Sequence, residues 1–238
     1  MPRAVRRLAT AAAEYAIGRA GIAVVRVLDR DAIGQGHRPW GAAGGVTGWV
    51  FAHRPSNRQR NRWAVSLLGV QPADQVLEIG FGPGLAVAEL ARAGAGHVYG
   101  ADHSSVMLRQ ASRRNAAAIR AGRVSLVSAP VDQLPAALDG PFDAILAVNS
   151  LGFWPAPAER LAELRRRLVP GGRIAIASQP RCPGATAGTS RSAADEVENL
   201  LRSAGFTQLR TETLPLSPPV ICVLAAATGP DARHIPQT

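Results

Sequence analysis

From residue 57 onward, apolar and polar positions follow two alternating rhythms. Short apolar runs predict β-strands at residues 75–79, 97–101, 124–127, 142–148 and 173–178, and apolar positions three or four residues apart predict helices at 84–93, 104–121, 156–168 and 192–204. Strands that alternate with helices imply crossover connections and a parallel sheet with helices on both faces. Two more strands, near 207–213 and 219–227, have only a short link between them, which favours an antiparallel hairpin at one sheet edge. The pattern therefore predicts an α/β fold: a doubly wound, mostly parallel sheet in three layers.

The preceding residues form a separate part in this prediction. Residues 4–30 fit one or two helices, and residues 34–56 are rich in glycine, proline and aromatic side chains, which favours a loop or lid. The helix that follows has Ser56 or Asn57 as its cap and Trp63, Leu67 and Val70 on its inner face. We therefore divide the chain into residues 1–56, a basic helical segment with a lid, and residues 57–238, the main domain.

The distribution of charge supports this division into two parts. Residues 1–62 contain eleven arginines against three acids, which gives +8 of the formal net charge of +10. A basic arm of this kind can contact nucleic acid or anionic lipid, and it can equally be a solvated helix face. The sequence contains no lysine, so a Walker loop, a protein-kinase site and a pyridoxal-phosphate Schiff base are excluded.

The two cysteines are too few for a disulfide framework, and no apolar run approaches the length of a membrane span. We expect an intracellular, cytoplasmic protein. Its five histidines and two cysteines show no metal-ligand spacing, so we expect no metal site.

The most informative stretch is "VLEIGFGPGLAVAEL", residues 76–90, where Gly80, Gly82 and Gly84 follow Glu78. Three glycines between a strand and a helix suggest that a ligand lies against bare backbone. The spacing differs from the dinucleotide pattern G-x-G-x-x-G, because Leu85 occupies the place of the third glycine. Asp102 ends the next predicted strand, where a carboxylate can accept both hydroxyls of a ribose.

Together with "PFDAILAVNSLGFW" and the Val169-Pro170-Gly171-Gly172 turn, these motifs resemble those of class I S-adenosylmethionine-dependent methyltransferases, of the small-molecule, methyltransferase-11-like type. The resemblance covers about residues 57–227. It implies a seven-stranded sheet with its last strand antiparallel, and S-adenosyl-L-methionine as cofactor. The implied cofactor-binding residues are Glu78, Gly80, Phe81, Gly82, Gly84, Asp102, His103, Ala129, Pro130 and Asn149.

In this resemblance the glycine turn passes beneath the methionyl part of the cofactor, Glu78 helps to fix the turn and the cofactor amine, and Asp102 holds the ribose. His103 could stack on the adenine. Ala129 stands where many relatives carry an acid near the adenine amino group, so Asp132 or a backbone group would take over that contact.

No general base is marked, and we predict a site that works mainly by proximity. Asn149 and His53 are the weak catalytic candidates. The acceptor pocket is predicted from Phe153, Trp154, Arg181 in the 179–182 loop, and the lid residues Trp49 and Phe51, although aromatic residues at such spacings are more often core packing. A small, partly apolar acceptor is favoured over nucleic acid, because no recognition domain is inserted after the fifth strand.

Two other functions stay open from the sequence. One is a Rossmann-type NAD-dependent oxidoreductase, which Leu85 and the absence of a Tyr-x-x-x-Lys pair oppose. The other is a membrane-surface or nucleic-acid-binding protein that keeps the cofactor fold, with peripheral membrane contact through the basic amino-terminal segment. The oligomeric state is not predicted.

Overall fold

The computed structural model describes residues 55–180 and 182–227. Seven strands form one sheet: β1 (Gln75–Ile79), β2 (His97–Asp102), β3 (Val124–Ser128), β4 (Phe142–Val148), β5 (Leu168–Ser178), β6 (Thr207–Leu214) and β7 (Val220–Ala226). The helices are α4 (Pro55–Leu68), α5 (Leu85–Arg92), α6 (Ser105–Arg114), α7 (Ala116–Arg120), α8 (Pro157–Arg166) and α9 (Ala187–Ser203), with short 3₁₀ turns at Ala136–Leu138 and Leu151–Phe153.

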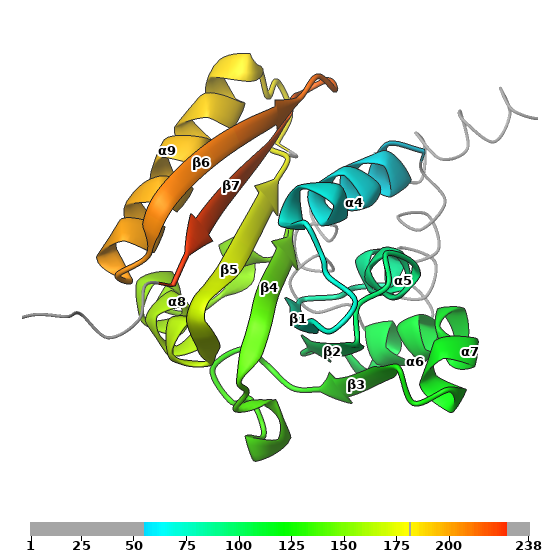
Figure 1. Ribbon diagram of the computed structural model, residues 1–238. Helices are drawn as coiled ribbons and strands as arrows, with labels where there is room; N and C mark the ends of the chain where they lie inside the picture. The colour runs from blue at the N-terminus through cyan, green and yellow to red at the C-terminus, as the bar shows by residue number, and fades with distance from the viewer. Residues whose placement is uncertain (1–54, 181, 228–238) are drawn as a thin grey trace, which may run out of the picture.

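The strand order is β3-β2-β1-β4-β5-β7-β6, and every neighbouring pair is parallel except those that involve β7. The predicted fold class is therefore confirmed, including the antiparallel hairpin at the edge (Figure 1). The winding changes direction between β1 and β4. In an open α/β sheet a ligand site is expected beyond the carboxyl ends of the strands at this switch point.

Most predicted elements lie within a few residues of the observed ones, and the differences have local causes. The predicted helix 104–121 breaks at Asn115 into α6 and α7. Helix α9 starts before the predicted residue 192 because Thr186 and Thr189 form a reciprocal capping box. Strand β5 begins at Leu168, so the predicted Pro-Gly-Gly turn is part of an irregular strand with a register shift.

The prediction for α4 was partly wrong. The helix begins at Pro55, before the expected cap, and its buried residues are Asn57, Arg60, Asn61, Ala64, Val65 and Leu68. Trp63, Leu67 and Val70 are only partly buried against the core. Residues 1–54, which include almost all of the predicted amino-terminal part, lie outside the described residues.

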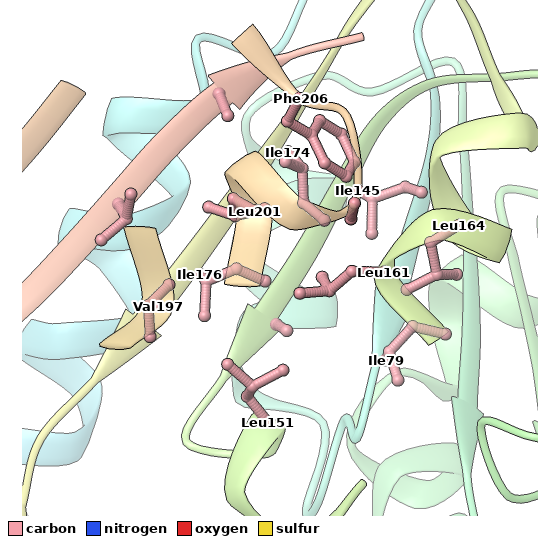
Figure 2. Close-up of a cluster of buried hydrophobic side chains, with 14 of the residues drawn as sticks. Ile79, Ile145, Leu151, Leu161, Leu164, Ile174, Ile176, Val197, Leu201 and Phe206 are labelled. Atoms are coloured by element: carbon pink, nitrogen blue, oxygen red, sulfur yellow. The ribbon is translucent and has the colours of Figure 1, made fainter. Parts of the chain in front are cut away.

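The sheet separates two hydrophobic clusters. On one face α8 and α9 pack on the strands through residues such as Leu161, Leu164, Val197 and Leu201 (Figure 2). On the other face α4, α5 and α6 pack through residues such as Leu68, Val87 and Leu90. Neighbouring residues of β4 serve opposite clusters, which explains why the central strands read as continuous apolar runs.

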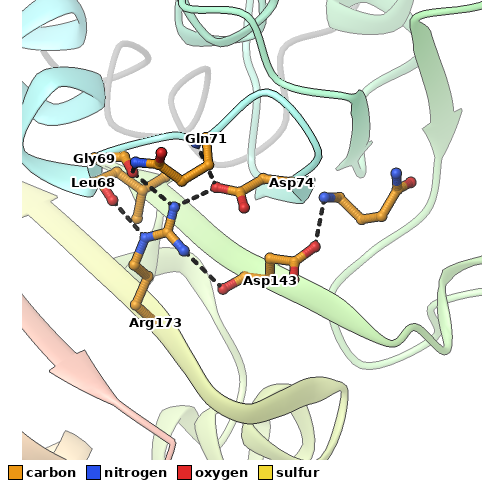
Figure 3. A network of polar contacts seen from close by, with 7 residues as sticks. Leu68, Gly69, Gln71, Asp74, Asp143 and Arg173 are labelled. Carbon is orange, nitrogen blue, oxygen red and sulfur yellow. Dashed lines mark hydrogen bonds and ion pairs between the residues drawn. The ribbon is translucent and has the colours of Figure 1, made fainter.

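A polar network at the amino ends of the strands anchors α4 to the sheet (Figure 3). The Arg173 guanidinium donates to the carbonyl oxygens of Leu68 (2.6 Å) and Gly69 (2.9 Å) at the end of α4, and it forms an ion pair with Asp74. Asp143 accepts a hydrogen bond from the Gln75 N–H at 2.7 Å. A cation at the carboxyl end of a helix is favourable. The network fixes the end of α4 that lies farthest from the ligand edge of the sheet.

No helix among the described residues has both the length and the apolar character needed to cross a membrane.

Candidate active site

The glycine turn follows β1 at the switch point of the sheet. Gly80, Gly82 and Gly84 all have positive φ angles, of 77°, 51° and 76°. Residues other than glycine rarely adopt this left-handed backbone conformation. The turn delivers the chain directly into α5, whose first residue is Leu85.

The three glycines are bare for different reasons. A Cβ on Gly80 would lie 2.3 Å from the Ser150 Cβ, and one on Gly84 would lie 2.8 Å from the Ala111 Cβ of α6. A Cβ on Gly82 would meet no atom of the described residues within 4 Å. Two of the glycines thus make room for the protein itself, and of the three only Gly82 leaves its Cβ position open within the described part of the chain.

Glu78 is buried beneath this turn, with 1% of its surface exposed. Its carboxyl accepts a hydrogen bond from the Val87 N–H in the first turn of α5, which caps that helix from the strand. The other oxygen, Oε2, has no hydrogen-bond partner among the described residues. Burial and the nearby Asp102 carboxyl raise the pKa of Glu78 to about 8.

Asp102 joins the end of β2 to the glycine turn. Its Oδ2 accepts a hydrogen bond from the Gly82 N–H at 2.8 Å, and its Oδ1 accepts one from the Ser104 N–H at 2.9 Å. Burial raises the pKa of Asp102, and these two N–H groups and His103 oppose that effect. Each carboxylate oxygen keeps a second lone pair, so the side chain that shapes the turn can still accept from a ligand.

The remaining predicted cofactor residues lie in different settings. The Phe81 ring is buried and packs over Gly100, so it belongs to the core. His103 is exposed beside Asp102, at 3.7 Å between Nδ1 and Oδ1. The Ala129 N–H donates to the Asp102 carbonyl oxygen at 2.9 Å, and Pro130 is exposed. Asp132 lines a hollow against α8.

A second set of contacts lies beyond β4 and β5. Asn149 has a positive φ of 54°, and its Oδ1 accepts a hydrogen bond from the Gln179 N–H at 2.8 Å. The Gln179 side chain then accepts from Arg60 of α4 and donates to the Pro218 carbonyl oxygen, both at 2.8 Å. Next to Asn149, Ser150 donates its hydroxyl to the Ile79 carbonyl oxygen at 2.7 Å. The end of β4 is thus tied to β1 on one side and to β5 and α4 on the other.

Comparisons with known proteins agree with this geometry. A family model described as a methyltransferase domain matches residues 76–172, which run from β1 into β5. The uncharacterized methyltransferase YdaC of Bacillus subtilis is 28% identical over 182 residues, 76% of this chain and 97% of that protein. Residues 76–172 match a methyltransferase domain, and the motifs and sheet around them are those of a class I S-adenosylmethionine-dependent methyltransferase. The family and the enzyme class predicted from the motifs are therefore confirmed.

Two further proteins, one curated relative and one solved structure, are also similar to this chain. The ubiquinone/menaquinone biosynthesis C-methyltransferase UbiE of Geotalea daltonii is 31% identical over 122 residues, and the match spans 50% of this chain and about half (52%) of that protein. The N-methyltransferase NodS from Bradyrhizobium japonicum, solved with S-adenosyl-L-homocysteine, superposes with a TM-score of 0.60 at 18% identity, over 75% of this chain and 90% of that one. At this identity the superposition shows the shared fold.

The methyltransferase's predicted acceptor pocket is only partly described. Phe153 is 49% exposed, whereas Trp154 is 8% exposed and packs in the core cluster beneath α8 and α9. Trp154 is therefore a core residue, as the packing alternative predicted. Trp49, Phe51, His53 and Arg181 lie outside the described residues. No group of three or more potential metal ligands occurs in the described ranges.

Sequence reasoning missed Arg60 and Gln179. A signal was present in α4, because Asn57, Arg60 and Asn61 share a face with Ala64 and Leu68. Three polar residues on the buried stripe of a helix indicate polar partners across the interface. The partner itself is 119 residues away in sequence, so local pattern could not name it.

Proposed function

We propose that the protein transfers a methyl group from S-adenosyl-L-methionine to a small, partly apolar acceptor. The observation that carries this proposal is the open side of Gly82, which adjoins the buried carboxyl of Asp102. Bare backbone and an acceptor for hydroxyl groups together suit an adenosyl ligand at the switch point of the sheet.

The residues present fit this cofactor. Glu78 Oε2, which has no hydrogen-bond partner among the described residues, would be completed by an ammonium group, since a buried acceptor without a donor is costly. The free lone pairs of the Asp102 carboxylate would accept from ribose hydroxyls. Gly82 would allow the ligand to approach the main chain closely.

The chemistry then depends on position. S-adenosyl-L-methionine supplies the methyl group on a sulfonium, and the leaving group is a neutral thioether. The Ser150 hydroxyl donates a hydrogen bond to the Ile79 carbonyl oxygen, and the Asn149 side-chain oxygen accepts one from the Gln179 N–H, so neither side chain is a general base in this proposal. The chain's contribution is to orient the acceptor and to exclude water. Orientation of this kind can lower a barrier by roughly 7–11 kcal/mol.

The acceptor class rests on two supports. The link between β5 and α9 is short, residues 179–186, so no recognition domain is inserted there. The relative UbiE is, by its name, a C-methyltransferase of quinone biosynthesis, which is chemistry on a small molecule. The exposed Phe153 ring follows β4 and would offer apolar contact to such an acceptor.

Calorimetry tests the cofactor part of the proposal. We expect S-adenosylhomocysteine to bind and NAD not to bind. The variant Asp102→Ala should lose affinity by roughly 1.5–3 kcal/mol, or about 10- to 100-fold, because a hydrogen bond to a charged group is removed. Asp195→Ala, an exposed acid of α9, is the matched control. Preferential binding of NAD, or full affinity in Asp102→Ala, would refute the assignment. A screen of acceptors with labelled methyl donor, read by mass spectrometry, identifies the product.

A further inference from the structure

The structure separates charge between its two helical layers. The sheet carries α4 to α7 on one face and α8 and α9 on the other (Figure 1). The first layer presents exposed arginines that we call the basic layer: Arg58, Arg62, Arg92, Arg109, Arg113, Arg114, Arg120 and Arg123. Of the acids between residues 55 and 123, Asp74, Glu78 and Asp102 are buried, which leaves Glu89 near the surface.

Several arginines of the opposite layer have acidic partners, whereas the basic layer offers one acid near its surface, Glu89. On the opposite side of the molecule Arg160 pairs with Glu159 and Glu163, Arg167 with Asp139, and Arg202 with Glu198. On the basic layer Glu89 is shared by Arg62 and Arg92. Within the described ranges, Arg58, Arg109, Arg113 and Arg120 form no ion pair. Most of the positive charge of this layer therefore has no acidic partner in the described part of the chain.

Like charges are also close to one another on the basic layer. Arg109 and Arg113 are four residues apart on α6, where side chains are neighbours and like charges repel. Burial lowers the pKa of Arg114, and the nearby Arg58 lowers it further. Anions that lie against such an arrangement would relieve the repulsion between these arginines.

The basic layer reaches the cofactor site. Arg114 Nε donates to the Pro83 carbonyl oxygen at 2.9 Å, within the glycine turn. A partner bound to this layer would therefore lie beside the candidate active site.

We propose that the basic layer binds an anionic lipid surface, through contacts between guanidinium groups and lipid phosphates. Phosphate recognition by arginine needs charge and N–H donors alone. Sequence-tolerant binding of single-stranded nucleic acid also uses aromatic side chains on which bases stack. Among the described residues the exposed large hydrophobic side chain is Phe153, which follows β4 and is outside the basic layer. If the proposed function holds, the same contact places the enzyme where a partly apolar acceptor would be dissolved.

Vesicle sedimentation of the full chain tests this assignment. The probe is vesicles of phosphatidylcholine with and without phosphatidylglycerol. One variant carries Arg109→Gln, Arg113→Gln and Arg120→Gln. The matched control carries Arg191→Gln, Arg202→Gln and Arg210→Gln, which removes the same charge from exposed positions of α9 and β6. The amino-terminal arginines are present in both, so their contribution cancels in the comparison.

We expect the full chain to sediment with the anionic vesicles, and high salt to release it. The α6–α7 variant should lose at least roughly tenfold in partitioning, since each basic residue near an anionic membrane contributes roughly a fivefold gain. The control should stay within twofold of wild type. Absence of vesicle binding, equal loss in both variants, or tighter binding of duplex DNA than of anionic vesicles would overturn the proposal. S-adenosylhomocysteine binding, measured in parallel, reports separately on the proposed function.

Discussion

The buried carboxyl of Glu78 makes the stability of the fold depend on pH in a direction that can be measured. Burial and Asp102 raise its pKa from 4.5 to about 8. The folded protein therefore binds more protons than the unfolded chain between these values. Because the folded-state pKa is the higher one, the stabilisation is complete below pH 4.5 and is lost as the pH rises through about 8.

The size of the effect follows from the interval between the two pKa values. One pKa unit corresponds to about 1.36 kcal/mol, so the interval from 4.5 to about 8 amounts to roughly 5 kcal/mol in the free energy of unfolding. The substitution Glu78→Gln removes the titration but keeps an oxygen that can accept from the Val87 N–H. We expect the variant and the wild type to be similarly stable near pH 4.5, and the variant to be more stable by roughly 5 kcal/mol above pH 8.

Urea unfolding at several pH values measures this difference directly. Glu196→Gln, an exposed glutamate on α9, is the control, and we expect its difference from wild type to be the same at every pH. A Glu78→Gln variant whose difference from wild type also stays constant with pH would refute the reasoning. If the cofactor amine lies at Glu78 Oε2, S-adenosylhomocysteine binding at neutral pH should release a proton. Calorimetry in two buffers of different ionisation enthalpy detects that release.

The other predictions concern the turn, the anchor of α4 and the acceptor side. Gly82→Ala should lower S-adenosylhomocysteine affinity, with a stability loss of only about 1–2 kcal/mol. Gly80→Ala should lower the melting temperature more than Gly82→Ala does, because its Cβ would clash with Ser150. Equal effects of the two variants would contradict the different roles of these glycines. Arg173→Ala should cost roughly 1.5–3 kcal/mol in urea unfolding and leave S-adenosylhomocysteine affinity unchanged. Gln179→Ala should reduce methyl transfer at least about tenfold, because Arg60 of α4 would lose its hydrogen bond to this side chain, while cofactor affinity is retained. Unchanged turnover in this variant would exclude Gln179 from the site.

The sheet was predictable because its central strands are buried on both faces. Ile145 and Leu146 are adjacent in β4, yet they belong to opposite clusters, so the strand needs apolar residues at successive positions. The glycine turn could also be predicted from the sequence, since a φ of 77° at Gly80 excludes most other residues. Both features are local, and local sequence carries them.

The features that the sequence hid depend on distant partners. The buried face of α4 was predicted incompletely, because it includes Arg60, whose partner Gln179 lies at the end of a strand far along the chain. The ionisation of Glu78 depends on complete burial and on Asp102, and neither can be computed from spacing. The role of Gly82 emerged only by contrast with Gly80 and Gly84, whose neighbours come from other elements.

Two consecutive residues at the end of β4 connect the two halves of the site. Ser150 binds the last carbonyl of β1 and packs on Gly80, so it fixes β4 relative to the glycine turn. Asn149 turns the backbone the other way and holds the first N–H after β5, which Gln179 then links to α4. A catalyst without a general base relies on the distance and angle between donor and acceptor. If the proposed function holds, this short segment would set both, because Ser150 Oγ and Asn149 Oδ1 are already hydrogen-bonded within the protein.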